Sequence, residues 1–340
     1  MKKITNENEA VLIASPSNLF YFTDMKNSDS YALFVGNEKY YFTDERYSEE
    51  AGNKLSGYTV KNINELHDFF KSAKIKKLGI EQSTLPHEFC TSLLEDGVET
   101  FFGVDARINK LRSIKSAAEI EFIKKAQEIT DKTFEEILPA IKEGITEIEL
   151  AGILESLLYV NGADDLSFTS IVAFGENTSK PHAERSEKRL TNGSIITLDF
   201  GAKYRNYCSD MTRTVFFGSA DDEQKKIYNH VLTAQEMALS IAYSGMSAKE
   251  CDAMARKYFA ENGLDKFFIH TLGHGVGIDI HEYPRLAQNS DTIMEENMVV
   301  TIEPGLYFEN NFGVRIEDLI IFDKSGIINL TKSPKNIIIL

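Results

Sequence analysis

Two acidic side chains stand on neighbouring strand-like segments in the middle of the chain. Asp199 lies in the apolar run Ile195–Ala202, Asp210 lies in Tyr207–Phe217, and the short linker Lys203–Asn206 joins them. A turn centred on that linker would place Asp199 directly opposite Asp210. Two carboxylates about 5 Å apart repel by about 3 kcal/mol at an effective dielectric constant of 20. A shared proton or a bound cation would remove that repulsion.

A second pair of acids follows the same plan near the C-terminus. The chain reverses near Asn310, which brings Glu303 close to Glu317. The register of this hairpin stays open, because Pro304 and a loop of odd length allow a bulge. The four carboxylates carry a charge of about −4, and two divalent cations would neutralise them.

Three histidines gather in one glycine-rich segment, at positions 270, 274 and 281. Gly273 and Gly275 make a helix unfavourable there, and Thr271 stands where a zinc-peptidase HExxH motif needs glutamate. A fourth histidine, His182, lies in a loop after a strand. One imidazole with four carboxylates suits a first-row divalent ion, with Mn²⁺ favoured and Co²⁺, Fe²⁺ or Zn²⁺ as alternatives.

An internal repeat predicts how these residues are positioned. The segment Gly144–Gly162 returns as Gly245–Gly263, and each copy opens a helix with a capping box, at Thr146 and at Ser247. A long amphipathic helix precedes each copy, and strands follow it. We therefore expect two related halves, each with two helices and then strands. The alternative is a chance similarity between two capped helices.

The chain before this region predicts a separate small α/β domain. Strand-like segments are Glu9–Ala14, Tyr31–Val35, Lys39–Phe42 and Lys77–Glu81, and helix-like segments are Asn64–Lys74 and Leu85–Glu95. The domain shows no catalytic cluster. A boundary near Asn109–Lys115 divides the chain into domains of residues 1–112 and 113–340.

Composition limits the partners and the compartment. With a hydrophobic fraction of 42% and a net charge of −15, the 340-residue chain is typical of globular proteins and poorly suited to nucleic acid or an anionic membrane. It has no run of about 18 apolar residues and no signal peptide. Its three cysteines are odd in number and widely spaced, so they do not indicate a disulfide framework. We expect a cytoplasmic protein.

Six sequence strings resemble one known family. They are Leu198–Ala202, Tyr207–Thr214, Gly273–Ile278, His281–Pro284, Thr301–Gly305 and Val314–Asp318. This pattern resembles the family of methionine aminopeptidase, prolidase and aminopeptidase P, closely over residues 111–335 and loosely before them. The resemblance implies a creatinase-like N-terminal α/β domain, followed by a pseudo-symmetric "pita-bread" catalytic domain.

The resemblance also implies a set of site residues. The metal ligands would be Asp199, Asp210, His274, Glu303 and Glu317. Asp210 and Glu317 would bridge two ions, and Glu303 would also shuttle protons. The other catalytic residues would be His182, His270, His281 and Arg315. His182 and His281 would contact the substrate, and Arg315 would orient the carboxylates.

The implied reaction is hydrolysis by a water that bridges the two metals. The N-terminal domain favours an Xaa-Pro aminopeptidase, acting on peptides with proline in the second position, over a methionine aminopeptidase. The main alternative is an Xaa-Pro dipeptidase (prolidase). A dipeptidase needs a cation for the substrate carboxylate, and Arg185, Arg205 and Arg285 are candidates. A non-peptidase metallohydrolase or an inactive binding homologue is less favoured, because no ligand is missing. Family precedent implies a homodimer.

Overall fold

The computed structural model describes residues 4–6 and 9–340. The chain divides into two compact units, Met1–Arg112 and Ser113–Leu340. None of the helices within the described ranges combines the length and the apolar character needed to cross a lipid bilayer.

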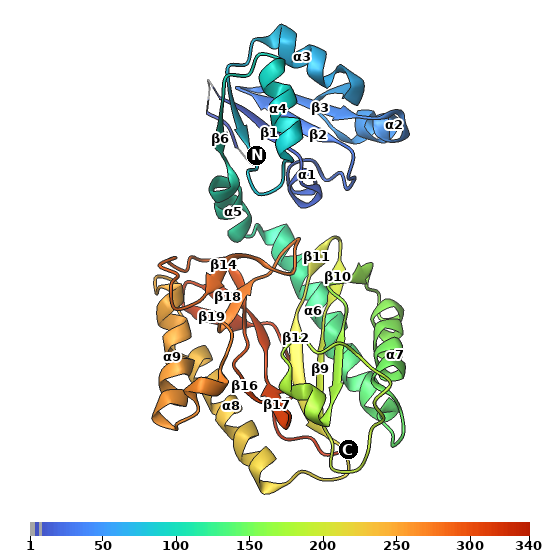
Figure 1. The fold of residues 1–340 in the computed structure, drawn as a ribbon, viewed down its shortest axis with the longest axis vertical. Helices are drawn as coiled ribbons and strands as arrows, with labels where there is room; N and C mark the ends of the chain where they lie inside the picture. The colour runs from blue at the N-terminus through green and yellow to red at the C-terminus, as the bar shows by residue number, and fades with distance from the viewer. Residues whose placement is uncertain (1–3, 7–8) are drawn as a thin grey trace. The chain divides into compact units, whose positions relative to one another are not determined.

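The N-terminal unit is built on one six-stranded mixed sheet, in the order β4-β3-β2-β1-β5-β6 (Figure 1). Side chains alternate along its central strand, so that Val11 and Ile13 enter one core cluster while Ala10 and Leu12 enter another. The strands are β1 (Ala10–Ile13), β2 (Tyr31–Val35), β3 (Glu38–Thr43), β4 (Thr59–Asn62), β5 (Lys77–Ile80) and β6 (Thr100–Gly103). The helices are α1 (Pro16–Thr23), α2 (Glu45–Lys54), α3 (Leu66–Ala73), α4 (His87–Glu95) and α5 (Asp105–Ser113).

The first half of the C-terminal unit begins with two packed helices, α6 (Ala117–Ile137) and α7 (Glu147–Val160). The predicted capping box at Thr146 and Glu149 is present. The strands that follow form the order β12-β9-β8, with β10, β11 and β7 in a second small sheet. Their bounds are β7 (Asp165–Leu166), β8 (Ile171–Phe174), β9 (Ile195–Phe200), β10 (Ala202–Tyr204), β11 (Tyr207–Cys208) and β12 (Met211–Phe216).

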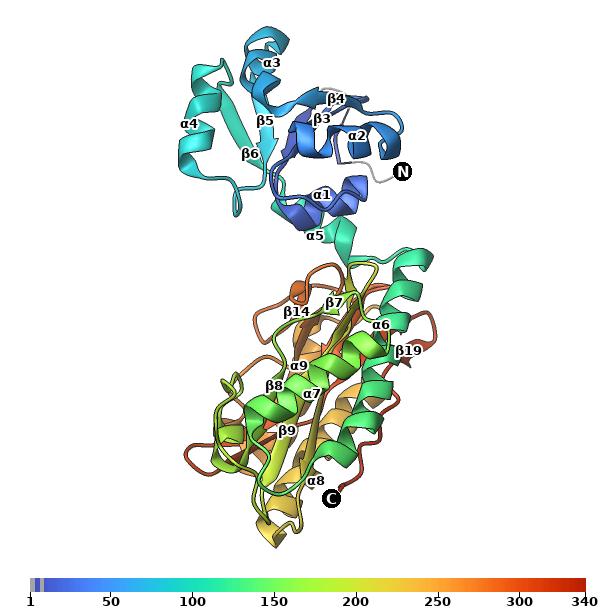
Figure 2. The same cartoon turned by 90° about the vertical axis from the view of Figure 1, so that its right-hand side faces the viewer.

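The second half repeats this plan with α8 (Asp222–Ile241) and α9 (Ala248–Glu261), which also pack together (Figure 2). The capping box at Ser247 and Glu250 is present as well. The strand order is β14-β13-β15-β18-β19, with β16 and β17 as a separate hairpin. The strands are β13 (Gly273–Gly275), β14 (Glu282–Leu286), β15 (Val299–Ile302), β16 (Gly305–Phe308), β17 (Phe312–Arg315), β18 (Asp318–Asp323) and β19 (Gly326–Asn329). The predicted two-half arrangement is therefore confirmed.

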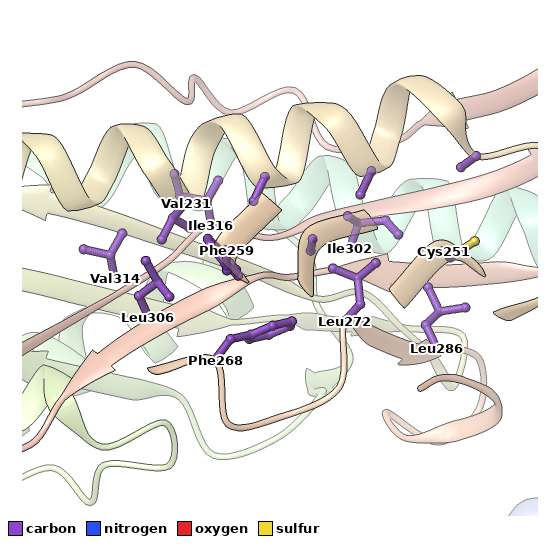
Figure 3. Packing of buried hydrophobic residues seen from close by; sticks show 14 of the residues in the cluster. Val231, Cys251, Phe259, Phe268, Leu272, Leu286, Ile302, Leu306, Val314 and Ile316 are labelled. Carbon is purple, nitrogen blue, oxygen red and sulfur yellow. The ribbon is translucent and has the colours of Figure 1, made fainter. Parts of the chain in front are cut away.

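Apolar packing holds the second-half strands against α8 and α9. Figure 3 shows Leu306 and Val314 of the β16–β17 hairpin near Val231 of α8, and Phe259 of α9 near Phe268. These side chains are almost completely buried. Burial of a large apolar side chain contributes about 1.5–3 kcal/mol, so this cluster fixes the strands that carry the acidic residues.

Candidate metal centre

The first acidic hairpin has a register that differs from the prediction. Asp199 pairs with Thr212 in the β9–β12 ladder, and not with Asp210. The turn is formed by Arg205 and Asn206, whose φ angles of 50° and 66° place both in the left-handed region. A two-residue turn of this kind moves the register by two residues relative to a four-residue turn centred on Lys203–Asn206.

The two aspartates nevertheless stay on one face of the hairpin, because a shift of two residues preserves the side-chain face. Asp199 and Asp210 are diagonal neighbours, and they are 7% and 4% exposed. Burial, followed by the charges of Glu317 and Asp199, raises the pKa of Asp210 well above its ordinary value. The predicted repulsion between buried carboxylates is therefore present in this geometry.

The second acidic hairpin keeps one register across Pro304. The β15–β18 ladder ends just before Glu303, and the β16–β17 ladder continues the same pairing beyond it. By that register, Glu303 lies directly opposite Glu317. Burial raises the pKa of Glu303 to about 8 and that of Glu317 well above its ordinary range.

His274 joins the two halves of the site. Its Nε2 lies 3.5 Å from Oδ2 of Asp210 and 3.4 Å from Oε1 of Glu303. Its Nδ1 donates a hydrogen bond of 3.1 Å to the carbonyl of Gly275, which leaves the Nε2 lone pair free for a ligand. Burial lowers the pKa of His274 to about 3, so the imidazole is neutral at pH 7.

Two observations show that the donor set fits divalent cations. Asp199 Oδ1, Asp210 Oδ1 and Glu317 Oε1 are buried without a hydrogen-bond partner. Ligand atoms of Asp210, His274 and Glu317 lie within 4.8 Å of one another. Buried polar atoms are normally paired, so unpartnered carboxylate oxygens in a cluster that also holds a neutral imidazole indicate a cation site.

Arg315 and Thr212 fix the orientation of the acids from behind. Arg315 Nη2 donates to Asp199 Oδ2 at 2.5 Å, and its Nε donates to the Thr212 hydroxyl at 2.9 Å. That hydroxyl donates in turn to Glu317 Oε2 at 2.6 Å. One carboxylate oxygen of Asp199 and one of Glu317 are thereby held by the protein, while the other oxygen of each residue is left for a ligand.

His270 is connected to this network through a tyrosine. Arg315 Nη1 donates to the Tyr307 hydroxyl at 2.8 Å, and that hydroxyl lies 3.0 Å from His270 Nε2. His270 Nδ1 donates to the Thr271 carbonyl, and burial lowers the pKa of His270 to about 3. His270 Nε2 is therefore an acceptor, and Tyr307 donates to it.

The other two predicted histidines lie nearer to solvent. The ring of His281 is 4.3 Å from the ring of His274, and burial, followed by the charge of His182, lowers the pKa of His281. The backbone on either side of the His182 loop is anchored by the buried Glu147, which accepts hydrogen bonds from the amides of Phe174 and Ser186. No hydrogen bond joins His182 to the acidic cluster among the contacts described for residues 4–6 and 9–340.

Sequence reasoning missed three residues of the site. Thr212 and Tyr307 carry the contacts described above, and Thr301 Oγ1 donates to Glu303 Oε1 at 3.1 Å. Thr301 could have been found from strand alternation, because it precedes Glu303 by two residues and so shares its face. Thr212 could have been found only with the correct hairpin register. No sequence pattern marks Tyr307 as a residue of the site.

Bare backbone is needed beside a candidate ligand in each half. A Cβ atom on Gly201, next to β9, would lie 2.0 Å from the carbonyl oxygen of Ser209. A Cβ atom on Gly273, next to His274, would lie 2.0 Å from the carbonyl oxygen of Thr301. Each glycine therefore lets two backbones approach closely beside a candidate ligand.

Comparisons with known proteins place the whole chain in one family. The model of metallopeptidase family M24 matches residues 121–324, and the model of the creatinase/prolidase N-terminal domain matches residues 5–114. The chain therefore belongs to metallopeptidase family M24. It is a hydrolase of a family that uses divalent metal ions, as the sequence resemblance implied.

Named relatives match this chain over almost its full length. An Xaa-Pro dipeptidase of Pyrococcus horikoshii is 40% identical over 336 residues, which cover 98% of this chain and 95% of the relative. The structure of an Xaa-Pro dipeptidase from Bacillus anthracis has a TM-score of 0.94 at 39% identity, covering 98% of this chain and 95% of that chain. An X-Pro aminopeptidase from Thermotoga maritima has a TM-score of 0.91 at 35% identity, covering 98% of each chain. These matches confirm the predicted pita-bread fold with its N-terminal creatinase-like domain.

Proposed function

We propose that the chain is an Xaa-Pro dipeptidase with two divalent ions held by Asp199, Asp210, His274, Glu303 and Glu317. The observation that carries the proposal is that ligand atoms of Asp210, His274 and Glu317 lie within 4.8 Å of one another, while one carboxylate oxygen each of Asp199, Asp210 and Glu317 is buried without a hydrogen-bond partner. The sequence favoured an Xaa-Pro aminopeptidase, with the dipeptidase as its alternative. The names of the relatives support the dipeptidase more strongly, since the matching Pyrococcus and Bacillus anthracis proteins bear that name.

The bound ions would supply an activated water and polarise the scissile carbonyl. Glu303 would accept and return a proton at its carboxylate, whose Oε1 lies 3.1 Å from the Thr301 hydroxyl and 3.4 Å from His274 Nε2. His281, exposed beside His274, would donate a hydrogen bond to the oxygen that gains charge. His182 would assist from its loop. Arg315 and His270 would hold the carboxylates through Thr212 and Tyr307.

Arg285 is the arginine best placed for a dipeptide carboxylate. It lies on β14 directly opposite His274, and it is exposed. Its charge contributes to lowering the pKa values of His274 and His281. Arg185, by contrast, is paired with Glu155 at 2.8 Å, and Arg205 occupies the β10–β11 turn. A guanidinium beside the metals would select a substrate whose carboxylate lies one residue beyond the scissile bond.

The metal identity, assembly and compartment are further parts of the proposal. Mn²⁺ suits the oxygen-rich ligand set, with Co²⁺, Zn²⁺ and Fe²⁺ as alternatives. The sequence resemblance supports a homodimer. The three free cysteines and the acidic composition support a cytoplasmic location, without nucleic-acid or membrane partners.

The test is an assay of metal-stripped protein with Ala-Pro and with Ala-Pro-Ala, before and after addition of Mn²⁺. We expect hydrolysis of Ala-Pro that depends on the added metal, and little hydrolysis of the tripeptide. Faster cleavage of the tripeptide would make the chain an Xaa-Pro aminopeptidase. Cleavage of neither peptide by metal-loaded protein would contradict the Xaa-Pro assignment.

A further inference from the structure

A buried ion pair lies behind the segment that carries His281 and Arg285. Lys115 Nζ donates to Glu282 Oε1 at 2.6 Å, and the two side chains are 1% and 8% exposed. Glu282 directly follows His281 and precedes Arg285 by three residues. Two charges are costly to bury, and removing one partner of such a pair is strongly destabilising because it leaves the other charge uncompensated.

Lys115 is itself fixed to the strand that leads to the metal centre. Its backbone amide donates to the Asn297 carbonyl at 3.0 Å, and the preceding residue, Ile114, forms an isolated bridge with Met298. Met298 adjoins β15, whose end leads into Glu303. The backbone of Lys115 is therefore tied to the strand that leads to Glu303.

The carboxylate of Glu282 reaches back across the same segment. A Cβ atom on Gly277 would lie 2.3 Å from Glu282 Oε1, so the carboxylate lies directly against the Gly277 backbone. The Gly277 carbonyl accepts a hydrogen bond of 2.7 Å from the Cys208 amide, next to the first acidic hairpin. We call residues 276–285 the substrate segment. Glu282 of the ion pair therefore lies against Gly277, near the other end of the substrate segment.

The backbone ladder alone does not fix this segment. β13 and β14 pair regularly where His274 is opposite Arg285, but the register then shifts, and Gly275 is opposite Glu282. The two residues between Glu282 and Arg285 have no partner in the ladder. A bulge of this kind redirects side chains and weakens local pairing. The Lys115–Glu282 ion pair lies at the start of this unpaired stretch.

We propose that Lys115 and Glu282 are positioning residues that hold the substrate segment in place, so that His281 and Arg285 meet the peptide. The part of the proposal that concerns the peptide rests on the proposed function. Neither residue touches the candidate ligands in the contacts that the structure describes; each acts through the backbone of the segment.

The experiment compares K115M, E282Q and the double variant K115M/E282Q with the wild type, using full-length, metal-loaded protein. The double variant is included because it removes both charges of the buried pair together, so it remains informative if a single variant does not fold. The control is K124M, which removes one partner of the exposed Lys124–Glu121 pair on α6 (2.9 Å). Hydrogen exchange followed by mass spectrometry reports the mobility of the substrate segment directly.

We expect exchange in residues 276–285 to accelerate by about 10-fold in the double variant, while exchange elsewhere, bound metal and the K124M control stay unchanged. We also expect KM for Ala-Pro to rise by about 5- to 10-fold, with a smaller rise for Ala-Pro-amide, which lacks the carboxylate. Unchanged exchange in the segment, or equal acceleration throughout the chain, would overturn the proposal. Absence of wild-type cleavage would instead refute the proposed function, and the exchange result would still decide the positioning role.

Discussion

At the scale of single residues, two of the acids in the site, Asp199 and Glu317, are each held by the protein through one carboxylate oxygen. Thr212 and Arg315 occupy one oxygen of Glu317 and of Asp199, and the second oxygen of each acid is buried without a partner. An arrangement of this kind is unfavourable without cations, because each unsatisfied buried group costs about 1–3 kcal/mol. As proposed metal ligands, these acids would be positioned before the ions bind.

Asp210→Ala tests the bridging role of that residue. We expect kcat for Ala-Pro to fall by about 10³-fold, because several kcal/mol of charge stabilisation in the transition state are lost with the metals. The melting temperature of the metal-free variant should equal or exceed that of the metal-free wild type, because a buried acid has been removed. Turnover at the wild-type rate would exclude Asp210 from the metal set.

Arg285→Met tests the proposed carboxylate contact. A hydrogen bond to a charged group contributes about 1.5–3 kcal/mol, so KM for Ala-Pro should rise by about 10- to 100-fold. KM for Ala-Pro-amide should change little, and Arg185→Met provides the matched control. An equal rise in KM for both substrates would show that Arg285 does not bind the substrate carboxylate.

At the scale of elements, most of the fold could be predicted from the sequence, and the hairpin register could not. The capped helices α7 and α9 and the core strands were evident from local patterns, because caps and apolar periodicity act over a few residues. The β10–β11 turn was misplaced because neither Arg205 nor Asn206 is a glycine, although both take left-handed angles. The Tyr307 contact could not be predicted, because it joins β16 to the distant His270 only in the folded chain.

Gly273→Ala tests the close backbone approach beside His274. The added methyl would overlap the Thr301 carbonyl, so the free energy of unfolding should fall by about 1–3 kcal/mol in chemical denaturation. Gly152→Ala is the control, because nothing lies within 4 Å of a Cβ atom there. That change, inside helix α7, should stabilise the protein by about 0.5–1 kcal/mol. Equal stability of the two variants would contradict the close approach.

At the scale of the whole molecule, the buried site links stability to pH and to metal. Burial raises the pKa of Glu303 to about 8, above its ordinary value of 4.5, and it lowers the pKa values of His270 and His274 to about 3. The raised acid contributes stability below pH 4.5, which is lost as the pH rises through 8. The lowered histidines act in the opposite sense, but only below their ordinary pKa of 6.5. From pH 6.5 to 8, the acid effect therefore dominates.

Metal-free protein should accordingly lose roughly 5 °C in melting temperature between pH 6.5 and 8. Saturating Mn²⁺ should raise the melting temperature most at pH 8, because it binds the deprotonated acids of the folded chain. Glu303→Gln should reduce the pH dependence of the metal-free protein. Calorimetry at several pH values provides the measurement, and a melting temperature that rises across this window without metal would contradict the assigned burial.

The most direct measurement is a titration of the metal-stripped chain with Mn²⁺, in which bound metal and Ala-Pro hydrolysis are followed together. We predict that activity rises from near zero and reaches its plateau when about two ions are bound per chain, as a site with two cations among five ligands requires. Full hydrolysis by protein that contains no divalent metal would contradict the account.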